Sequence, residues 1–426
     1  MCRWPLVLSV FLLACPPLIA QERGESVLFT GAAVLDPAGE RLLEDHAVLV
    51  RGGRIVAVAP LATIDAPSTA RRVALDGLTL VPGLIDLHTH LLLRPYDEAT
   101  WNDQVLKESL ELRTIRATTA ARATLEAGFT TIRELGTEGA AYADVALRDA
   151  IARNIVPGPR IFAATRALVA TGCYGPSGFD PRWNVPKGAQ TADGVDGVRR
   201  AVREQIAAGA DWIKVYADYR RRPGDSATPT FSQSELNAIV DEARSAGLPV
   251  AAHAVTDEAI SRAVRAGVAT IEHGTNASDK VLSLMRERGV VMCPTLAASE
   301  AMARYSGWKP GEPEHPRIKA SREMFARLRE SGVTIACGSD AGVFAHGDNI
   351  RELELMVAYG LSATAALQSA TTVAAAVLGE ENDLGRIAEG FKADVIAVRG
   401  NPLKDPSVLR RPTVVVKAGR IVIDRR

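Results

Sequence analysis

The sequence predicts an α/β protein: a (β/α)8 barrel of the TIM type with a small β-sandwich built from both chain ends. Two observations carry this prediction. Eight short apolar runs alternate with amphipathic helical stretches through the middle of the chain, and similar strand–turn–strand segments lie near its two ends. Eight successive β–α units are typical of such a barrel, which often exceeds the usual domain length, so the 426 residues do not require several domains.

The expected strands are apolar runs bounded by glycine or polar turns. They cover residues 78–87, 130–135, 160–164, 212–217, 250–254, 269–273, 290–294 and 334–338. The expected helices cover residues 108–127, 194–208, 234–246, 257–266 and 316–330. Ser232 with Glu235 forms a capping-box pattern at one helix start, and Thr256 is the expected cap of another. The Gly- and Pro-rich stretch 171–190 is expected to be a long loop able to cover a site.

The two ends of the chain carry matching segments. Residues 48–56 and 414–422 each show a strand, a glycine-containing turn and a second strand, and residues 394–398 add another strand. We therefore expect the ends to fold together around an inserted centre. The predicted parts are a signal peptide (1–20), the first part of the sandwich (21–80), a metal-dependent barrel (81–381) and the second part of the sandwich (382–426).

The first residues have the pattern of an export signal. Arg3 precedes a short apolar core too short to span a bilayer, and Ala20 is the expected cleavage end. The protein is therefore expected to be secreted or periplasmic. Residues 12–15 also resemble a bacterial lipoprotein box, which would make Cys15 a lipid anchor. An apolar start on a cytosolic protein is the third alternative.

Composition excludes several classes of protein. With 50 Lys and Arg against 50 Asp and Glu, net charge is zero, and no long basic run indicates binding to nucleic acid or a membrane surface. The 5 cysteines are widely spaced, without the patterns of a disulfide framework or a zinc–thiolate site. We expect a small-molecule substrate and a homo-oligomer.

Polar side chains lie at the ends of the expected strands, where barrels hold their chemistry. They are His88, His90, Lys214, His253, His273 and Asp340. Four of the 7 histidines in the chain are in this set, so isolated core histidines explain it poorly. Neutral imidazoles with a carboxylate suit Zn²⁺ or a similar divalent ion, whose bound water becomes a nucleophile near neutral pH. Asp340 can both bind a metal and accept the proton of that water.

Lys214 is the unusual member of this set. It lies between Ile213 and Val215, so burial is expected to lower its pKa. The neutral amine can then add CO₂ and become a carbamate, in effect a carboxylate that bridges two metals. A lysine paired with a carboxylate is the alternative that the spacing leaves open.

These motifs together resemble the amidohydrolase superfamily. The markers occur in the expected order over almost the whole mature chain, at residues 83–90, 211–214, 253–254, 271–274 and 338–342. Within the superfamily the chain resembles the imidazolonepropionase-like group and, more closely, its prolidase-type metal-dependent dipeptidases and ochratoxin-hydrolysing enzymes. The resemblance implies two divalent ions, with Zn²⁺ favoured. His88, His90 and Asp340 would hold one ion, and His253 and His273 the other, bridged by carboxylated Lys214 and a hydroxide.

The resemblance also implies a reaction. The hydroxide would attack a metal-polarised carbonyl, and Asp340 would pass the proton to the leaving amine. The expected substrate has an amide bond next to a free carboxylate, as in a dipeptide, an Xaa-Pro-like peptide or an N-acyl amino acid, including ochratoxin-like compounds. The alternative is an imidazolonepropionase-like hydrolase of a cyclic amide or lactone, a site type that usually holds one metal and lacks the lysine. A non-catalytic binding protein is disfavoured, because all six ligand positions are filled.

Substrate contacts are expected from a few further residues. Tyr216 shares the inward face with Lys214, and Tyr219 and Arg220 follow it, so a hydroxyl and a guanidinium can hold an α-carboxylate. For Arg220 the alternative is a solvated loop. His346 is a candidate polar group near the site, with a loop-ordering hydrogen bond as its alternative.

One position departs from the family pattern. Tyr174 stands where many relatives carry the histidine of Gly-His-Gly. Its hydroxyl would have to stabilise the oxyanion in place of that histidine, or this task falls to the metal alone.

Overall fold

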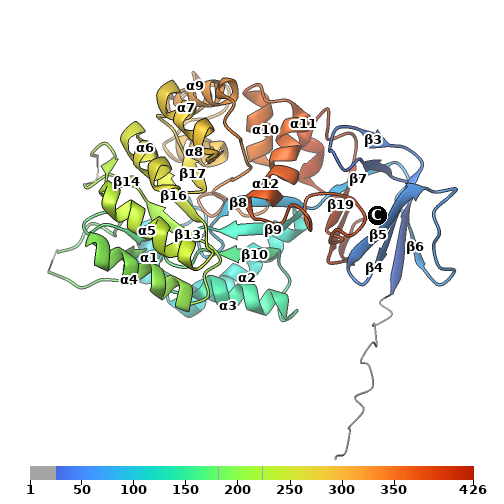
Figure 1. The fold of residues 1–426 in the computed structure, drawn as a ribbon, viewed down its shortest axis with the longest axis horizontal. Coiled ribbons are helices and arrows are strands. Elements are labelled where there is room, and N and C mark those ends of the chain that lie inside the picture. The colour runs from blue at the N-terminus through green and yellow to red at the C-terminus, as the bar shows by residue number, and fades with distance from the viewer. Residues whose placement is uncertain (1–24, 181, 223) are drawn as a thin grey trace, which may run out of the picture.

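A computed structural model describes residues 25–180, 182–222 and 224–426 of the chain (Figure 1). The predicted signal peptide, with Cys15 and Ala20, lies outside the described residues. No helix in the described part is both long enough and apolar enough to cross a bilayer.

Parallel strands and helices alternate through the centre of the chain. One parallel sheet has the order β10–β9–β8, formed by β8 (Leu84–Thr89), β9 (Phe129–Glu134) and β10 (Arg160–Ala163). A second has the order β12–β11–β13–β16–β17–β18, formed by β11 (Leu168–Val169), β12 (Gln190–Thr191), β13 (Ile213–Tyr216), β16 (Val250–Ala254), β17 (Thr270–His273) and β18 (Val291–Cys293). This arrangement is consistent with the predicted TIM-type barrel.

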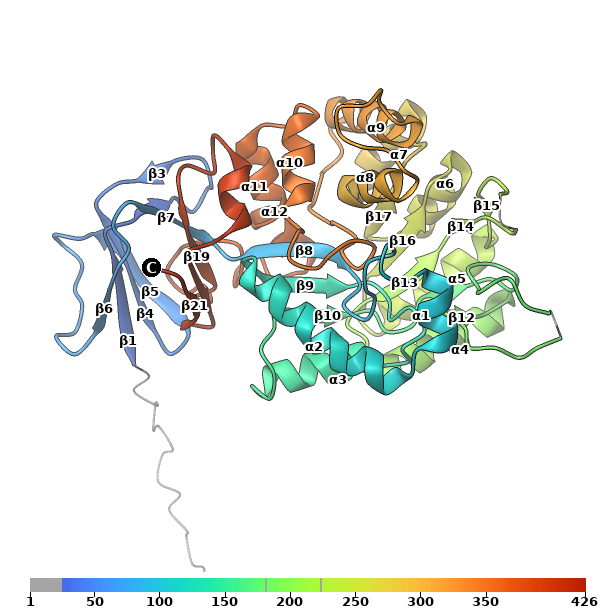
Figure 2. The ribbon, with the colours of Figure 1, turned by 180° about the vertical axis from the view of Figure 1, so that it is seen from behind.

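Helices cover the outer side of these strands (Figures 1 and 2). They are α1 (Trp101–Lys107), α2 (Leu110–Glu126), α3 (Ala143–Ala152), α4 (Gly194–Ala207), α5 (Gln233–Ser245), α6 (Asp257–Ala266), α7 (Asp279–Arg288), α8 (Leu296–Tyr305), α9 (Pro316–Ser331), α10 (Arg351–Ala358), α11 (Ala363–Ser369) and α12 (Thr372–Val377). The five expected helices are confirmed with small shifts at their ends. The capping box at Ser232 and the cap at Thr256 are also confirmed.

The two ends of the chain share one sheet beside this centre (Figure 2). Its order is β21–β20–β19–β7–β2–β3, with β2 (Ala33–Leu35), β3 (Leu42–Leu43), β7 (Leu78–Pro82), β19 (Val395–Arg399), β20 (Val414–Lys417) and β21 (Arg420–Asp424). A second sheet has the order β5–β4–β1–β6, with β1 (Ser26–Thr30), β4 (His46–Arg51), β5 (Arg54–Pro60) and β6 (Arg71–Ala74). Apolar side chains of both sheets share one buried core, among them Phe29, Val48, Leu80 and Val395.

Two expected strands were wrong. The run 78–87 is not one strand but two, because the chain changes sheet at Gly83: β7 pairs with β19, and β8 pairs with β9. A Cβ on Gly83 would lie 2.2 Å from Thr130 Oγ1, so glycine is needed where the strands approach. Residues 334–338 form only isolated bridges, since Ile335 pairs with Met292 while Leu87 N bonds to Cys337 O on the other side. Because successive residues of this segment bond to different neighbouring strands, they do not form a continuous strand.

The remaining elements are short. A two-residue hairpin, β14 (Asp218–Tyr219) with β15 (Thr228–Pro229), follows β13, and the 3-10 helix η1 (Pro406–Arg410) precedes β20. The third expected strand ends as β10 at Ala163, and the chain turns through Thr165, whose φ is 59°, before β11. The predicted long loop follows β11 and runs beside the site described next.

Candidate active site

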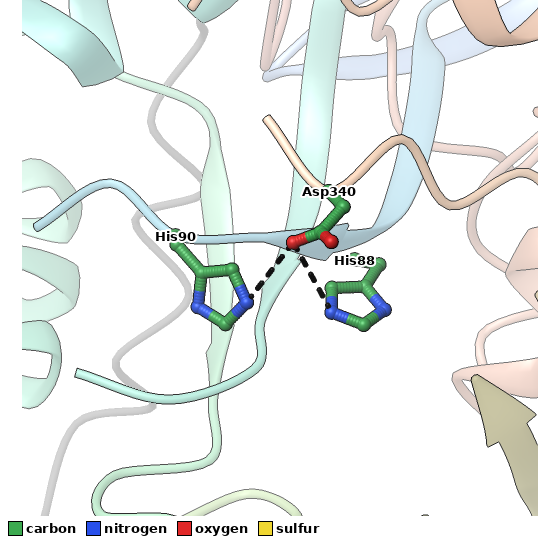
Figure 3. A group of neighbouring side chains, drawn as sticks. All are labelled: His88, His90 and Asp340. Carbon is green, nitrogen blue, oxygen red and sulfur yellow. Dashed lines mark ion pairs between the residues drawn. The ribbon is translucent and has the colours of Figure 1, made fainter. Parts of the chain in front are cut away.

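His88, His90 and Asp340 form a compact group at one end of β8 (Figure 3). Asp340 Oδ1 lies 3.6 Å from His88 Nε2 and 3.3 Å from His90 Nε2. Ligand atoms of all three residues lie within 4.8 Å of one another. The i, i+2 spacing places both imidazoles on the same side of the strand, as predicted. Two imidazole nitrogens and a carboxylate oxygen are a donor set that fits a divalent first-row ion.

The far side of each imidazole ring is held in place. His88 Nδ1 donates to Glu272 Oε2 at 2.8 Å, and His90 Nδ1 donates to the carbonyl of Gly136 at 2.9 Å. With Nδ1 engaged in this way, the Nε2 atom of each ring faces Asp340. Partners of this kind fix the tautomer and raise the basicity of a metal-binding histidine.

The other two predicted histidines lie beside this group. His253 on β16 and His273 on β17 are on neighbouring parallel strands, and their ring centroids are 4.6 Å apart. His273 lies 5.2 Å from His88 between centroids, and its Nδ1 is 2.7 Å from Thr295 Oγ1. Within the described residues, the close ligand group contains only His88, His90 and Asp340. His253 and His273 therefore remain candidates for a second ion.

Lys214 on β13 is buried, with 1% of its surface exposed. Burial lowers the pKa of its ammonium group. Across the described parts of the chain no carboxylate lies within 4.0 Å of its Nζ, so the alternative of a paired lysine finds no partner. The structure thus buries Lys214 without an ion-pair partner among the described residues.

Protonation in this cluster follows from burial and charge. Burial alone would raise the pKa of Asp340, but the neighbouring His88 and His90 hold it below its usual range. Burial lowers the pKa of His273 to about 4, which leaves it neutral at pH 7. Burial is outweighed at His90, where Asp340 and Glu138 raise the pKa to about 9. A metal ion would compete with that proton, because a histidine ligand binds in its neutral form.

Comparison with known proteins decides the family. The model of the amidohydrolase family matches residues 79–422. The chain belongs to the amidohydrolase family. It is 30% identical over 459 residues to ochratoxinase of Aspergillus niger, which covers 99% of this chain and 92% of that protein. It is a hydrolase acting on carbon–nitrogen bonds.

Two solved structures are also similar. A Xaa-Pro dipeptidase with methionine bound in its active site is 33% identical, with a TM-score of 0.84 over 94% of this chain and 100% of that one. A prolidase in complex with N-methylphosphonate-L-proline is 35% identical, with a TM-score of 0.82 over the same shares, 94% and 100%.

In this amidohydrolase, Asp86 ties β8 to the loop that carries Asp340. Its buried carboxylate accepts hydrogen bonds from Ser339 N at 3.0 Å, Ser339 Oγ at 2.5 Å and Asn349 Nδ2 at 2.8 Å. Asp340 itself has a φ of 64°, which is uncommon for an aspartate and marks a strained position. A Cβ on Gly342 would lie 2.5 Å from His90 O, so the loop closes on the site only with glycine there.

Glu272 and Arg133 form a hydrogen-bonded pair that holds the ring of His88 in place. Glu272 Oε1 accepts from Arg133 Nη2 at 2.8 Å, and Arg133 Nε donates to the carbonyl of Leu87 at 2.7 Å. The guanidinium of Arg133 lies 4.3 Å from the ring of Trp212. This pair was not predicted from the sequence, although a charged residue inside a doubly buried strand was an available signal.

A cavity of about 310 Å³ lies over the cluster, and most of the predicted substrate-binding residues line it. Tyr174, Tyr216, Tyr219 and Arg220 all line it, with the Arg220 guanidinium 5.2 Å from the ring of Tyr219. Further lining residues, which were not predicted from the sequence, are Tyr96, Trp101, Glu138 and Arg317.

His346 is not brought to this cavity within the described chain. Its Nε2 donates to the carbonyl of Leu93 at 3.2 Å, and burial lowers its pKa to about 4. The structure therefore favours the loop-ordering alternative for His346.

Tyr174 is positioned differently from the prediction. Its hydroxyl donates to the carboxylate of Glu138, and its ring stacks on Tyr216 at 4.2 Å between centroids. The proton that would stabilise an oxyanion is thus directed at Glu138.

Proposed function

We propose that the protein is a metal-dependent amidohydrolase that cleaves an amide bond next to a free carboxylate. The substrate classes are dipeptides, Xaa-Pro-like peptides and N-acyl amino acids, including ochratoxin-like compounds. The observation that carries the proposal is the meeting of four imidazoles and Asp340 at one cavity that arginines also line, with Lys214 buried on β13. Similarity to a dipeptidase, a prolidase and an ochratoxinase supports it.

The metal site would hold two divalent ions, with Zn²⁺ favoured by the nitrogen and oxygen donors. His88, His90 and Asp340 would hold one, and His253 and His273 the other, with the carbamate of Lys214 between them. Ions of this kind supply Lewis acidity to water and to the scissile carbonyl.

The side chains of the protein carry the proton transfer and the binding. Because Asp340 stays ionised, it can accept a proton from water and deliver it to the leaving amine. Arg220 and Arg317 bring positive charge to the cavity and can hold the substrate carboxylate. The surrounding aromatic side chains limit the access of bulk water.

We also propose how the domains of the protein are built and where the protein is located. The central strands would close into one (β/α)8 barrel, since Ala163 O bonds to Asp211 N and Ala341 bridges to Thr89 across the edges of the two parallel sheets. The terminal sheets would form the β-sandwich, supported by their shared core. The apolar start of the sequence supports export to the periplasm or medium, with Cys15 as the alternative anchor.

The test is hydrolysis by purified protein loaded with Zn²⁺. The panel combines dipeptides, Xaa-Pro peptides, N-acyl amino acids and imidazolonepropionate, with the Asp340→Asn variant as the matched control. We expect amide cleavage by the wild type and a loss of about 10²- to 10⁴-fold in kcat for the variant, the range for a lost acid–base group. No amide cleavage on the panel would overturn the proposal. Preference for imidazolonepropionate, with one ion per chain, would establish the cyclic-amide alternative.

A further inference from the structure

Glu138 is a carboxylate in the wall of the active-site cavity that the proposed chemistry does not use. It is 2% exposed and lies in the loop after β9. Its Oε2 accepts hydrogen bonds from Trp101 Nε1 at 2.7 Å and from the Tyr174 hydroxyl, and its Oε1 lies 3.5 Å from the Tyr216 hydroxyl. We call Glu138, Trp101, Tyr174 and Tyr216 the Glu138 wall.

The carboxylate of Glu138 has no ion pair with a lysine or an arginine in the described part of the protein. No Lys or Arg nitrogen of that part comes within 4.0 Å of it. The nearest imidazole nitrogen, His90 Nδ1 at 3.8 Å, is already directed at the carbonyl of Gly136. A buried carboxylate is costly unless its surroundings compensate it, and here its hydrogen bonds come from aromatic donors.

The aromatic donors determine what the wall offers to a ligand. Tyr174 and Tyr216 each direct a phenol hydroxyl at Glu138. Each hydroxyl has one proton, and in both it is directed at Glu138. The lone pairs of the two hydroxyl oxygens therefore remain available to a ligand, and the negative charge of the Glu138 carboxylate lies behind them. Such a surface accepts hydrogen bonds and attracts a cation, and it repels a carboxylate or an oxyanion.

We propose that the Glu138 wall binds a protonated amine of the substrate, so that an unblocked dipeptide is preferred over an N-acyl amino acid of the same shape. The proposal rests on the function proposed above and narrows its substrate class. A dipeptide is a zwitterion, and the cavity is bipolar: Arg220 and Arg317 line it together with Glu138. A neutral acyl chain would leave the charge and acceptors of the wall without a partner, and such mismatches discriminate strongly.

The test compares substrates that differ only in the ammonium group. Alanyl-proline is paired with propionyl-proline, and alanyl-phenylalanine with propionyl-phenylalanine, on the Zn²⁺-loaded full chain. We expect kcat/KM to favour the alanyl member by about tenfold or more. This preference should decline above a pH of about 8, where the substrate amine loses its proton.

Two variants assign the preference to the wall. Glu138→Gln keeps the size and a hydrogen-bond acceptor but removes the charge, and we expect it to abolish the preference chiefly by raising KM for the alanyl substrates. Tyr174→Phe keeps the charge and removes one acceptor, so it should reduce the preference without abolishing it. Thermal unfolding and metal content are measured for both, and if Glu138→Gln fails to fold, the wild-type pH profile and Tyr174→Phe decide.

The outcomes separate this proposal from the one on which it rests. Hydrolysis of the propionyl substrates as fast as, or faster than, the alanyl ones would overturn the ammonium subsite and leave the amidohydrolase function intact. An equal loss on both substrates in Glu138→Gln would show a purely structural carboxylate and also overturn it. Hydrolysis of neither member of any pair would be a failure of the proposed function itself.

Discussion

The chemistry of Lys214 follows from its burial away from water. An ammonium group is strongly hydrated in water. Lys214 is 1% exposed, and no carboxylate among the described residues lies within 4.0 Å of its Nζ, so its charge has neither full hydration nor an ion-pair partner. Its pKa is lowered for that reason, and a neutral amine is the form that reacts with CO₂. Lys417 is a useful contrast: burial, then Arg160, lowers its pKa to about 8, but its Nζ donates to the carbonyl of Gly158, far from the histidine cluster.

The contrast gives a matched prediction at the scale of the residue. Lys214→Gln removes the amine on which the proposed carbamate would form, so we expect the Zn²⁺ content to fall from about two ions per chain to about one or fewer. Lys417→Gln should keep the wild-type content. Elemental analysis after dialysis against limiting Zn²⁺ measures both. Unchanged stoichiometry in Lys214→Gln would remove the bridging role.

At the scale of the element, the site depends on contacts between strands that are far apart in the sequence. Glu272 on β17 holds the ring of His88 on β8 and the guanidinium of Arg133 on β9. One carboxylate thus fixes three strands relative to one another at the base of the site. Because it is completely buried, any change in its charge is transmitted to the imidazole that it orients.

We therefore expect Glu272→Gln to weaken Zn²⁺ binding by about 10- to 100-fold, the usual cost of losing a group that orients a metal ligand. Competition with a chelator of known affinity measures the effect. Glu242→Gln is the control, because Glu242 makes ion pairs with Arg199 and Arg203 between α4 and α5, away from the cavity. Equal affinities for the two variants would contradict the role given to Glu272.

Local patterns could be predicted from the sequence, whereas contacts between segments far apart in the chain could not. Strand ends and helix caps depend on local patterns, so the sequence located the four histidines, Asp340 and Ser232 without a structure. It placed 78–87 in one strand because both halves are apolar; only the pairing of β7 with β19 shows the change of sheet at Gly83. Glu138 carries no local signal, since its role depends on Trp101 and Tyr174, distant in sequence.

At the scale of the whole molecule, long-range contacts join the chain ends to the centre. Gly83 N, between β7 and β8, bonds to Asp394 O just before β19 at 2.8 Å, and Arg54 on β5 pairs with Asp383 at 2.8 Å. Global stability therefore depends on buried groups throughout the protein. Glu352 is one such group: its Oε2 accepts from Ala297 N at 2.8 Å and so joins α10 to α8, but its buried Oε1 has no hydrogen-bond partner among the described residues.

Burial raises the pKa of Glu352 from 4.5 to about 8, so the folded protein holds a proton that the unfolded chain releases. Stability is thus favoured at pH values below 4.5, decreases as the pH rises from there to about 8, and has lost this contribution above 8. Glu352→Gln keeps the uncharged form and an acceptor for Ala297 at every pH. Its Tm should exceed that of the wild type by the order of a few degrees at pH 8 and differ little at pH 5. Calorimetry on metal-free protein measures both; the same difference at the two pH values would show that Glu352 does not titrate in this window.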